Sequence, residues 1–156
     1  MERSRSYIAT PPGATIKEQI IDRGMKQKEF AARMGMSEKH ISKLINGEVK
    51  LTMDVARRLE MVLGLPAQFW CNLESIYREK LVKVNEENAM EYDMEIAKKM
   101  PYNEMAKNGW VEETSKLSER VINLRKFFEV AQLNLLKENL VPCIACRKLS
   151  ISEKSD

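Results

Sequence analysis

The sequence contains few of the residues on which catalytic and metal sites are built. Its 156 residues include one histidine and three cysteines. A zinc-peptidase helix needs two histidines four residues apart and a glutamate as base, so the single His40 excludes one. There is also no glycine-rich phosphate loop, no Ser/His/Asp set and no carboxylate pair with an evident task. We therefore expect a protein that is not an enzyme, with no catalytic residue, metal or cofactor.

Long apolar segments are missing as well. No apolar run approaches the roughly 20 residues that a membrane-spanning helix needs, so we expect no membrane partner. The first six residues are polar and lack the apolar region of a signal peptide. Three widely spread cysteines, an odd number, do not suggest a disulfide framework. These features favour a reducing, cytoplasmic location.

Two of the cysteines, Cys143 and Cys146, have the C-x-x-C spacing. A tetrahedral zinc site needs four ligands, and the remaining candidates, Cys71 and His40, belong to other elements. A thioredoxin-like redox motif would need a βαβ context, which is lacking. We interpret the pair as small apolar residues in a helical tail.

Charge is distributed unevenly along the chain. Residues 1–85 contain 15 Lys and Arg against 10 Asp and Glu, a net charge of +5, whereas residues 86–156 contain 11 against 13, a net charge of −2. A basic front half and an acidic back half fit a nucleic-acid-binding module that carries a different appendage. Excesses this small also occur on ordinary solvated faces, and that alternative stays open.

The spacing of apolar residues predicts an all-α protein without strands. Glycine and proline separate the segments, and helices are expected over 15–23, 27–34, 38–46 and 53–63, from Pro66 onward, over 89–100, and around 117–128 and 131–139. The first of these helices is expected to place Ile16, Ile20 and Ile21 on one face. We divide the chain into an N-terminal extended arm (1–13), a helical domain (14–85), a helical extension (86–149) and a polar tail (150–156).

Several helix starts carry residues that cap helices. Thr15 and Glu18 have the spacing of a capping box, in which each side chain accepts from the other residue's backbone amide. Ser37 and Thr52 are expected to cap the third and fourth helices, and Thr114 or Ser115 the helix near 117. The polar stretch 84–88 marks either a domain boundary or a pause in a long helix.

Residues 24–47 hold the most informative pattern, two short helices joined by a tight turn at Gly35. Their inner faces are apolar, and the outer face of the second helix is polar and rich in cations. Ala31 is the small residue at which the two helices would cross. This pattern is typical of a helix-turn-helix that places its second helix in the DNA major groove.

The outer face of that second helix would carry Glu38, Lys39, Ser42 and Lys43. Lysine can donate to guanine acceptors, and glutamate can accept from cytosine N4. Gln27 and the free N–H groups of the first helix could clamp a phosphate. Asn46 could hold a phosphate or cap its own helix, and His40 could contact the groove or be an ordinary surface histidine. The alternative for the whole pattern is a helical hairpin with a solvated polar face.

These residues resemble the Xre family of lambda-repressor-like DNA-binding domains, and residues 10–85 more narrowly resemble HigA-type antitoxins. The matching features are Pro12-Gly13 before the first helix, the Gly24–Gln27 run, the Leu51-Thr52 pair and, most specifically, the segment from Leu63 to Leu73. That last segment is similar to the Phe-Trp-x-Asn-Leu-Gln segment of those antitoxins, with Glu74 where the family often has glutamine.

The resemblance implies a five-helix lambda-repressor-like domain, a homodimer and a repressor that binds double-stranded operator DNA. It also implies a neighbouring gene for a cognate mRNA-cleaving toxin, as in a HigB/HigA-type module. On this basis the DNA-binding residues would be Gln27, Lys28, Ser37, Glu38, Lys39, His40, Ser42, Lys43 and Asn46. The dimer seam or the core between helices would contain Phe69, Trp70, Leu73 and Tyr77.

The back half has a weaker resemblance. Pro101, the Lys107–Trp110 run and the Val121–Phe128 segment resemble a longer class of these regulators, in which they lead into a zinc metallopeptidase domain. That likeness implies a chain that stops before the peptidase.

Two functions of different classes are compatible with the sequence. The first is a sequence-specific DNA-binding repressor, the antitoxin that autoregulates its own operon. The second is a protein-interaction module whose C-terminal half neutralises a toxin or another partner without specific DNA binding, since its acidic excess would suit a basic surface. The operator sequence, the toxin and its contact surface are open at this point.

Overall fold

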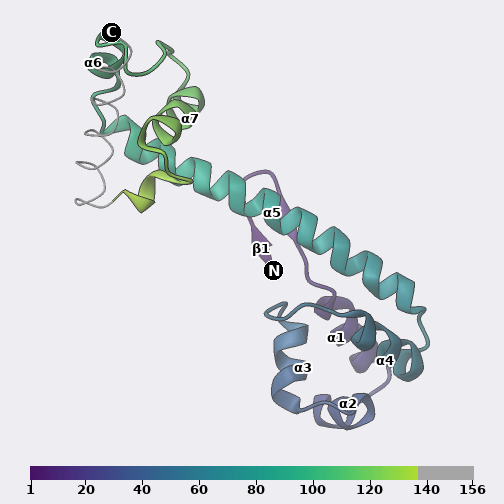
Figure 1. The fold of residues 1–156 in the computed structure, drawn as a ribbon. Coiled ribbons are helices and arrows are strands. Elements are labelled where there is room, and N and C mark those ends of the chain that lie inside the picture. Colours follow the sequence, from purple (N-terminus) through teal and green to yellow (C-terminus); the bar gives the residue numbers. More distant parts are fainter. Residues whose placement is uncertain (137–156) are drawn as a thin grey trace. The chain divides into compact units, whose positions relative to one another are not determined.

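The computed structural model describes residues 1–136. Two short strands precede a series of helices (Figure 1). The elements are β1 (Glu2–Arg3), β2 (Ile8–Ala9), α1 (Gly13–Asp22), α2 (Gln27–Met34), α3 (Glu38–Ile45), α4 (Met53–Leu63), α5 (Ala67–Lys98), α6 (Tyr102–Lys107), α7 (Leu117–Phe128) and a 3-10 turn, η1 (Leu133–Leu135). The prediction of a helical protein is confirmed. Within residues 1–136, no helix has the length and apolarity needed to cross a bilayer.

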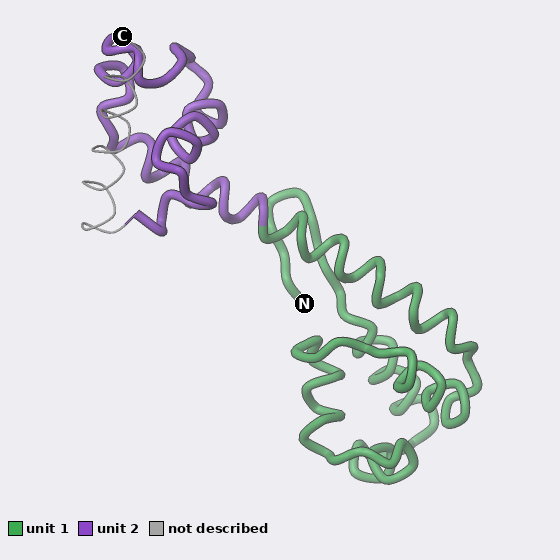
Figure 2. The backbone as a smooth tube through the Cα atoms, in the orientation of Figure 1, with its two compact units in different colours: residues 1–85 green, residues 86–156 purple. Residues whose placement is uncertain are grey.

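The chain forms two compact units, residues 1–85 and residues 86–156 (Figure 2). Each has its own apolar core, and α5 contributes residues to both. The polar stretch 84–88 does not interrupt this helix, so of the two alternatives the pause is absent, while the division between the two units falls within the stretch, after residue 85. Within this stretch Val84 is buried in a cluster with Ala9 of the N-terminal arm.

The core of the first unit draws on all five helices. Its buried residues are Ile16, Ile20, Phe30, Ala31, Met34, Ile41, Leu44, Leu51, Val55, Ala56, Leu59, Leu63 and Trp70. Most lie at the i, i+3 and i+4 positions that the sequence pattern indicated. Ile21 is an exception, because 65% of its surface is exposed. It is one position past Ile20, which is about 100° away around the helix and therefore off the buried face.

The expected helix starts are partly confirmed. The Ser37 hydroxyl accepts from the His40 amide at 3.1 Å, and the Thr52 hydroxyl accepts from the Val55 amide at 3.3 Å, so both predicted caps form. The capping box at Thr15 is wrong, because α1 already begins at Gly13 with Pro12 at its N-cap and no side-chain cap. Proline has a fixed φ suited to a helix start, which places the start two residues earlier.

The N-terminal arm forms an antiparallel hairpin in which Glu2 pairs with Ala9. This corrects the expectation of an extended arm and of a protein without strands. Ala9 is buried with Tyr77 and Val84 of α5, and the Lys83 ammonium lies 5.9 Å from the centre of the Tyr7 ring. Strands of two residues are too short to show alternation in a sequence, and here packing on α5 supports them.

In the second unit, α6, α7 and η1 pack on the C-terminal part of α5. The buried residues are Ala97, Tyr102, Met105, Val121, Leu124 and Leu133. Asp93, which is 1% exposed, accepts from Arg125 Nε at 2.7 Å and from the Leu133 amide at 2.9 Å. This carboxylate therefore joins α5, α7 and η1.

Two predictions for the back half are wrong, and others fall outside the described residues. Neither Thr114 nor Ser115 caps α7, whose N-cap is Lys116; the Thr114 hydroxyl donates to the Glu119 carboxylate instead. The short helix expected near 131–139 is only the 3-10 turn of η1 as far as residue 136. The cysteine pair and the tail 150–156 lie beyond the described residues.

Candidate nucleic-acid interface

The turn between α2 and α3 fixes how the two helices meet. Gly35 has φ +64°, in the left-handed region that glycine adopts without strain. The Met36 amide donates to the Ala31 carbonyl at 3.0 Å, and the Gly35 amide to the Ala32 carbonyl at 3.1 Å. These two bonds form a Schellman motif, which ends α2 and redirects the chain within three residues.

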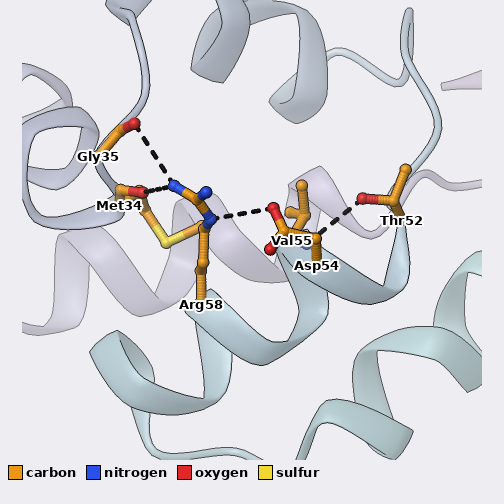
Figure 3. A network of polar contacts seen from close by, with 6 residues as sticks. All are labelled: Met34, Gly35, Thr52, Asp54, Val55 and Arg58. Carbon is orange, nitrogen blue, oxygen red and sulfur yellow. Dashed lines mark hydrogen bonds and ion pairs between the residues drawn. The ribbon is translucent and has the colours of Figure 1, made fainter.

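Arg58 of α4 is hydrogen-bonded to the backbone of this turn (Figure 3). Its Nη1 donates to the Met34 carbonyl at 2.9 Å, and its Nε donates to Asp54 Oδ2 at 3.0 Å. The Schellman motif uses the carbonyls of Ala31 and Ala32, so Arg58 provides a donor for the Met34 carbonyl that follows. The α2–α3 turn is thus tied to α4, which is itself anchored in the core.

The other end of α3 rests against α1. A Cβ atom on Gly13 would lie 2.0 Å from the Ile45 carbonyl oxygen, far inside van der Waals contact. Only glycine allows the first turn of α1 to approach the last turn of α3 this closely. With Ile41 and Leu44 buried in the core, both ends and the inner face of α3 are held in place.

The outer face of α3 carries the residues predicted to bind DNA. Ser37, Glu38, Lys39, Lys43 and Asn46 are exposed, and His40 and Ser42 are half-buried. Within residues 1–136, the side chains of Lys39, Lys43 and Glu38 have no hydrogen-bond or ion-pair partner. This helix thus presents cationic and acidic groups to solvent on a rigid support, which is the arrangement that base-edge recognition requires.

The start of α2 offers a separate anion-binding feature. No side chain caps this helix, and Gln27 and Lys28 of its first turn are exposed. The free N–H groups at a helix N-terminus attract phosphate oxygens, and a neighbouring glutamine or lysine adds donors. Gln27 and Lys28 belong to the helix that precedes α3, as the predicted backbone contacts require.

The aromatic residues predicted for a core or a dimer seam occupy different environments. The Trp70 side chain is fully buried in the core of the first unit, and Tyr77 is buried against Ala9 of the arm. Leu73 packs partly buried against the core. Phe69, 37% exposed, meets the Trp70 ring edge to face at 5.2 Å and leaves part of its surface open.

Sequence reasoning missed the two residues that position α3. Arg58 lies in an ordinary-looking i, i+4 pair with Asp54, and no pattern reveals its contact with a carbonyl 24 residues away. Gly13 follows two prolines, a context that indicates a turn. A glycine that lies inside a helix can mark the close approach of another backbone, and that is the signal that could have identified it. Among the described residues, no group of three or more His, Cys, Asp and Glu could hold a metal ion.

Comparison with known proteins identifies the same region as a helix-turn-helix. A helix-turn-helix family model matches residues 16–70. YddM, an uncharacterized HTH-type transcriptional regulator of Escherichia coli, is 32% identical over 78 residues, which are 47% of this chain and 83% of that protein.

Two solved structures also align with the chain. A HigA-family addiction module antidote protein from Coxiella burnetii is 24% identical, with a TM-score of 0.47 over 54% of this chain and 92% of that one. Pseudomonas aeruginosa antitoxin HigA, solved with the higBA promoter, is 21% identical, with a TM-score of 0.48 over 55% of this chain and 94% of that one. From the family model and the match to the E. coli regulator, the chain belongs to the helix-turn-helix family of transcriptional regulators.

Proposed function

We propose that this protein is a sequence-specific repressor that binds double-stranded DNA through α3. The observation that carries the proposal is the outer face of this helix, where Lys39 and Lys43 are exposed one turn apart and have no protein partner among the described residues. Its opposite face is buried, so the charges are aimed outward by the fold. Its function is binding, with no catalytic step.

The proposed complex places α3 in the major groove and the N-terminus of α2 against the backbone. Lys39 and Lys43 would donate to guanine O6 and N7, and Glu38 would accept from cytosine N4. Ser37, His40 and Ser42 border the same face, and Asn46 stands at its end. Gln27 and Lys28 would hold a phosphate and fix the register. A homodimer would read a palindrome with half-sites about 34 Å apart, one helical turn.

We further propose that the protein is a HigA-type antitoxin that represses its own operon in the cytoplasm. The support is the sequence resemblance of the Leu63–Leu73 segment, whose Trp70 is a core residue at the start of α5. Phe69, which stays partly exposed beside it, is available to a dimer seam. The cognate toxin would be encoded by an adjacent gene.

The test of DNA reading is a double variant, Lys39→Ala with Lys43→Ala, in footprinting on the DNA upstream of the protein's own gene. We expect the protected site to disappear, because the two lysines would supply the donors that recognise guanine O6 and N7. The control pair, Lys80→Ala with Lys107→Ala, removes the same charge from exposed positions off α3. An unchanged footprint in the first pair would refute the groove assignment.

A second candidate function, partner binding by the second unit, has an observation of its own. Trp110 is 57% exposed and stacks on Phe127 with ring centres 6.2 Å apart. Exposed tryptophans held by a neighbouring ring are common anchors of protein interfaces. If this unit neutralises a toxin, Trp110→Ala should weaken complex formation with the adjacent gene's product while leaving the DNA footprint intact. Equal binding by the variant would remove Trp110 from the interface.

A further inference from the structure

A groove of about 650 Å³ in the first unit is lined mainly by residues of α4. Its apolar lining comes mainly from Met53, Met61 and Val62, and its cationic lining from Arg33, Arg57 and Arg58. Gln68 of α5 adds a polar side chain to the lining. None of the residues assigned to DNA reading lines it. It is therefore a surface that the proposed DNA contact leaves unused.

The two methionines that line the groove, Met53 and Met61, are largely exposed to solvent. Met61 has 80% and Met53 has 53% of its surface accessible. Methionine side chains are flexible and polarizable, and exposed ones on a binding surface adapt to varied apolar partners. The two lie on one helix about two turns apart. Most of Met61 is uncovered, and Met53 keeps about half of its surface open although its sulfur accepts from the Cys71 thiol at 3.9 Å.

Most of the charged residues that line the groove are cationic. Arg57 has no hydrogen-bond or ion-pair partner among the described residues. Glu60, the one acidic lining residue, already uses its carboxylate to accept from the Ala67 amide at 2.6 Å, which caps the start of α5. The acidic partners of the two other arginines, Glu29 and Asp54, are not part of the lining. A ligand in the groove therefore meets guanidinium groups beside apolar carbon and sulfur.

From this combination we infer that the groove docks a short amphipathic segment of a partner protein, with acidic and large apolar residues on the face that meets the groove. Arginine pairs with carboxylates through two parallel hydrogen bonds, and Arg57 has its donors available for this. The two methionines would take the apolar side chains, as amphipathic helices are bound in other grooves. A nucleic acid backbone is the poorer match, because it has no apolar groups to cover the methionines.

The test uses a phage-displayed library of random 16-residue peptides selected on the full chain. We expect enriched peptides to combine Asp or Glu with Leu, Met or Phe. A synthetic copy of the most enriched peptide is then titrated by fluorescence anisotropy against the wild type, Arg57→Glu, Met61→Ser and the control Lys80→Glu. Binding should weaken at least tenfold in the first two variants and stay within twofold in the control.

Three results would overturn the inference: no enriched peptide, enrichment of basic peptides, or equal binding to Arg57→Glu and the wild type. DNA binding by the same variants separates this inference from the proposed function. Failure of the wild type to bind DNA would defeat the repressor assignment and leave the groove result standing, whereas the groove variants should bind DNA as the wild type does.

Discussion

The Arg58 guanidinium donates to the Met34 carbonyl at 2.9 Å, across 24 residues of sequence. This bond joins the last turn of α2 to α4 at the point where the chain turns toward α3 (Figure 3). A helix that reads DNA must be held in a fixed orientation, since small displacements of its side chains remove base contacts. We regard Arg58 as the residue that transmits the rigidity of α4 to the α2–α3 turn.

Replacing Arg58 by methionine should therefore destabilise the first unit by about 1–2 kcal/mol, because a charged hydrogen bond to a partly buried carbonyl is lost. Urea denaturation followed by circular dichroism measures the change as a lower midpoint with an unchanged slope. The matched control is Arg57→Met, which removes the same guanidinium group from the neighbouring position. Among the described residues, Arg57 has no hydrogen-bond or ion-pair partner to lose. Equal midpoints for the two variants would show that the carbonyl contact contributes nothing.

Gly13→Ala should be more damaging than its small size suggests. The added methyl group would lie 2.0 Å from the Ile45 carbonyl oxygen, so α1 and α3 must move apart. Overpacking of this kind costs about 1–3 kcal/mol and should also weaken DNA binding by shifting α3. Thermal unfolding and gel-shift titration measure the two effects.

Gly24→Ala is the comparison for that variant. Gly24 has φ +60°, but a methyl group added there would meet no atom within 4 Å, so only backbone strain of about 1 kcal/mol is expected. Its DNA affinity should remain close to that of the wild type. If Gly13→Ala kept full DNA affinity, the close approach of α1 to α3 would not set the position of the reading helix.

In the second unit, Asp93→Ala should unfold structure locally. The variant leaves the partly buried Arg125 without its ion-pair partner at 2.7 Å and removes the acceptor of the Leu133 amide. Loss of one partner from a buried pair costs about 3–5 kcal/mol. Hydrogen exchange should accelerate in α7 and η1 while α2 and α3 exchange as before. Glu91→Ala, an exposed carboxylate two residues away, is the control and should leave α7 protected.

The start of α7 should respond to acid. The Thr114 hydroxyl and Lys116 hold the pKa of the Glu119 carboxyl below its usual value. A lowered pKa in the folded state means that the stabilising contribution is present above the unfolded pKa and is lost as pH falls through the folded one. A side-chain NMR titration should show the shift, and Thr114→Val should return the pKa toward its ordinary value. An unchanged titration in that variant would remove the hydroxyl as the cause.

Most of the helical framework could be predicted from the sequence because it depends on local signals. Phe30, Ala31 and Met34 repeat at helical spacing and are all buried as expected, and Gly35 ends α2 in the left-handed conformation. The Ser37 cap likewise depends only on a side chain and an amide three residues away. Such features depend on residues only a few positions apart, so they can be recognised in the sequence without knowledge of the fold.

What escaped prediction depends on contacts between distant segments. The hairpin of residues 2–9 exists through packing of Ala9 on α5, and two-residue strands have no alternation to detect. The support of α3 by Gly13 and Arg58 is also tertiary.

The measurement that tests the repressor proposal most directly is binding of the purified protein to the DNA upstream of its own gene, compared with a scrambled duplex at two salt concentrations. We predict a preference for the upstream DNA of about 10³-fold or more, the scale of specific over non-specific binding. Weak, equal and strongly salt-dependent binding to both duplexes would contradict the proposal and leave only a basic surface.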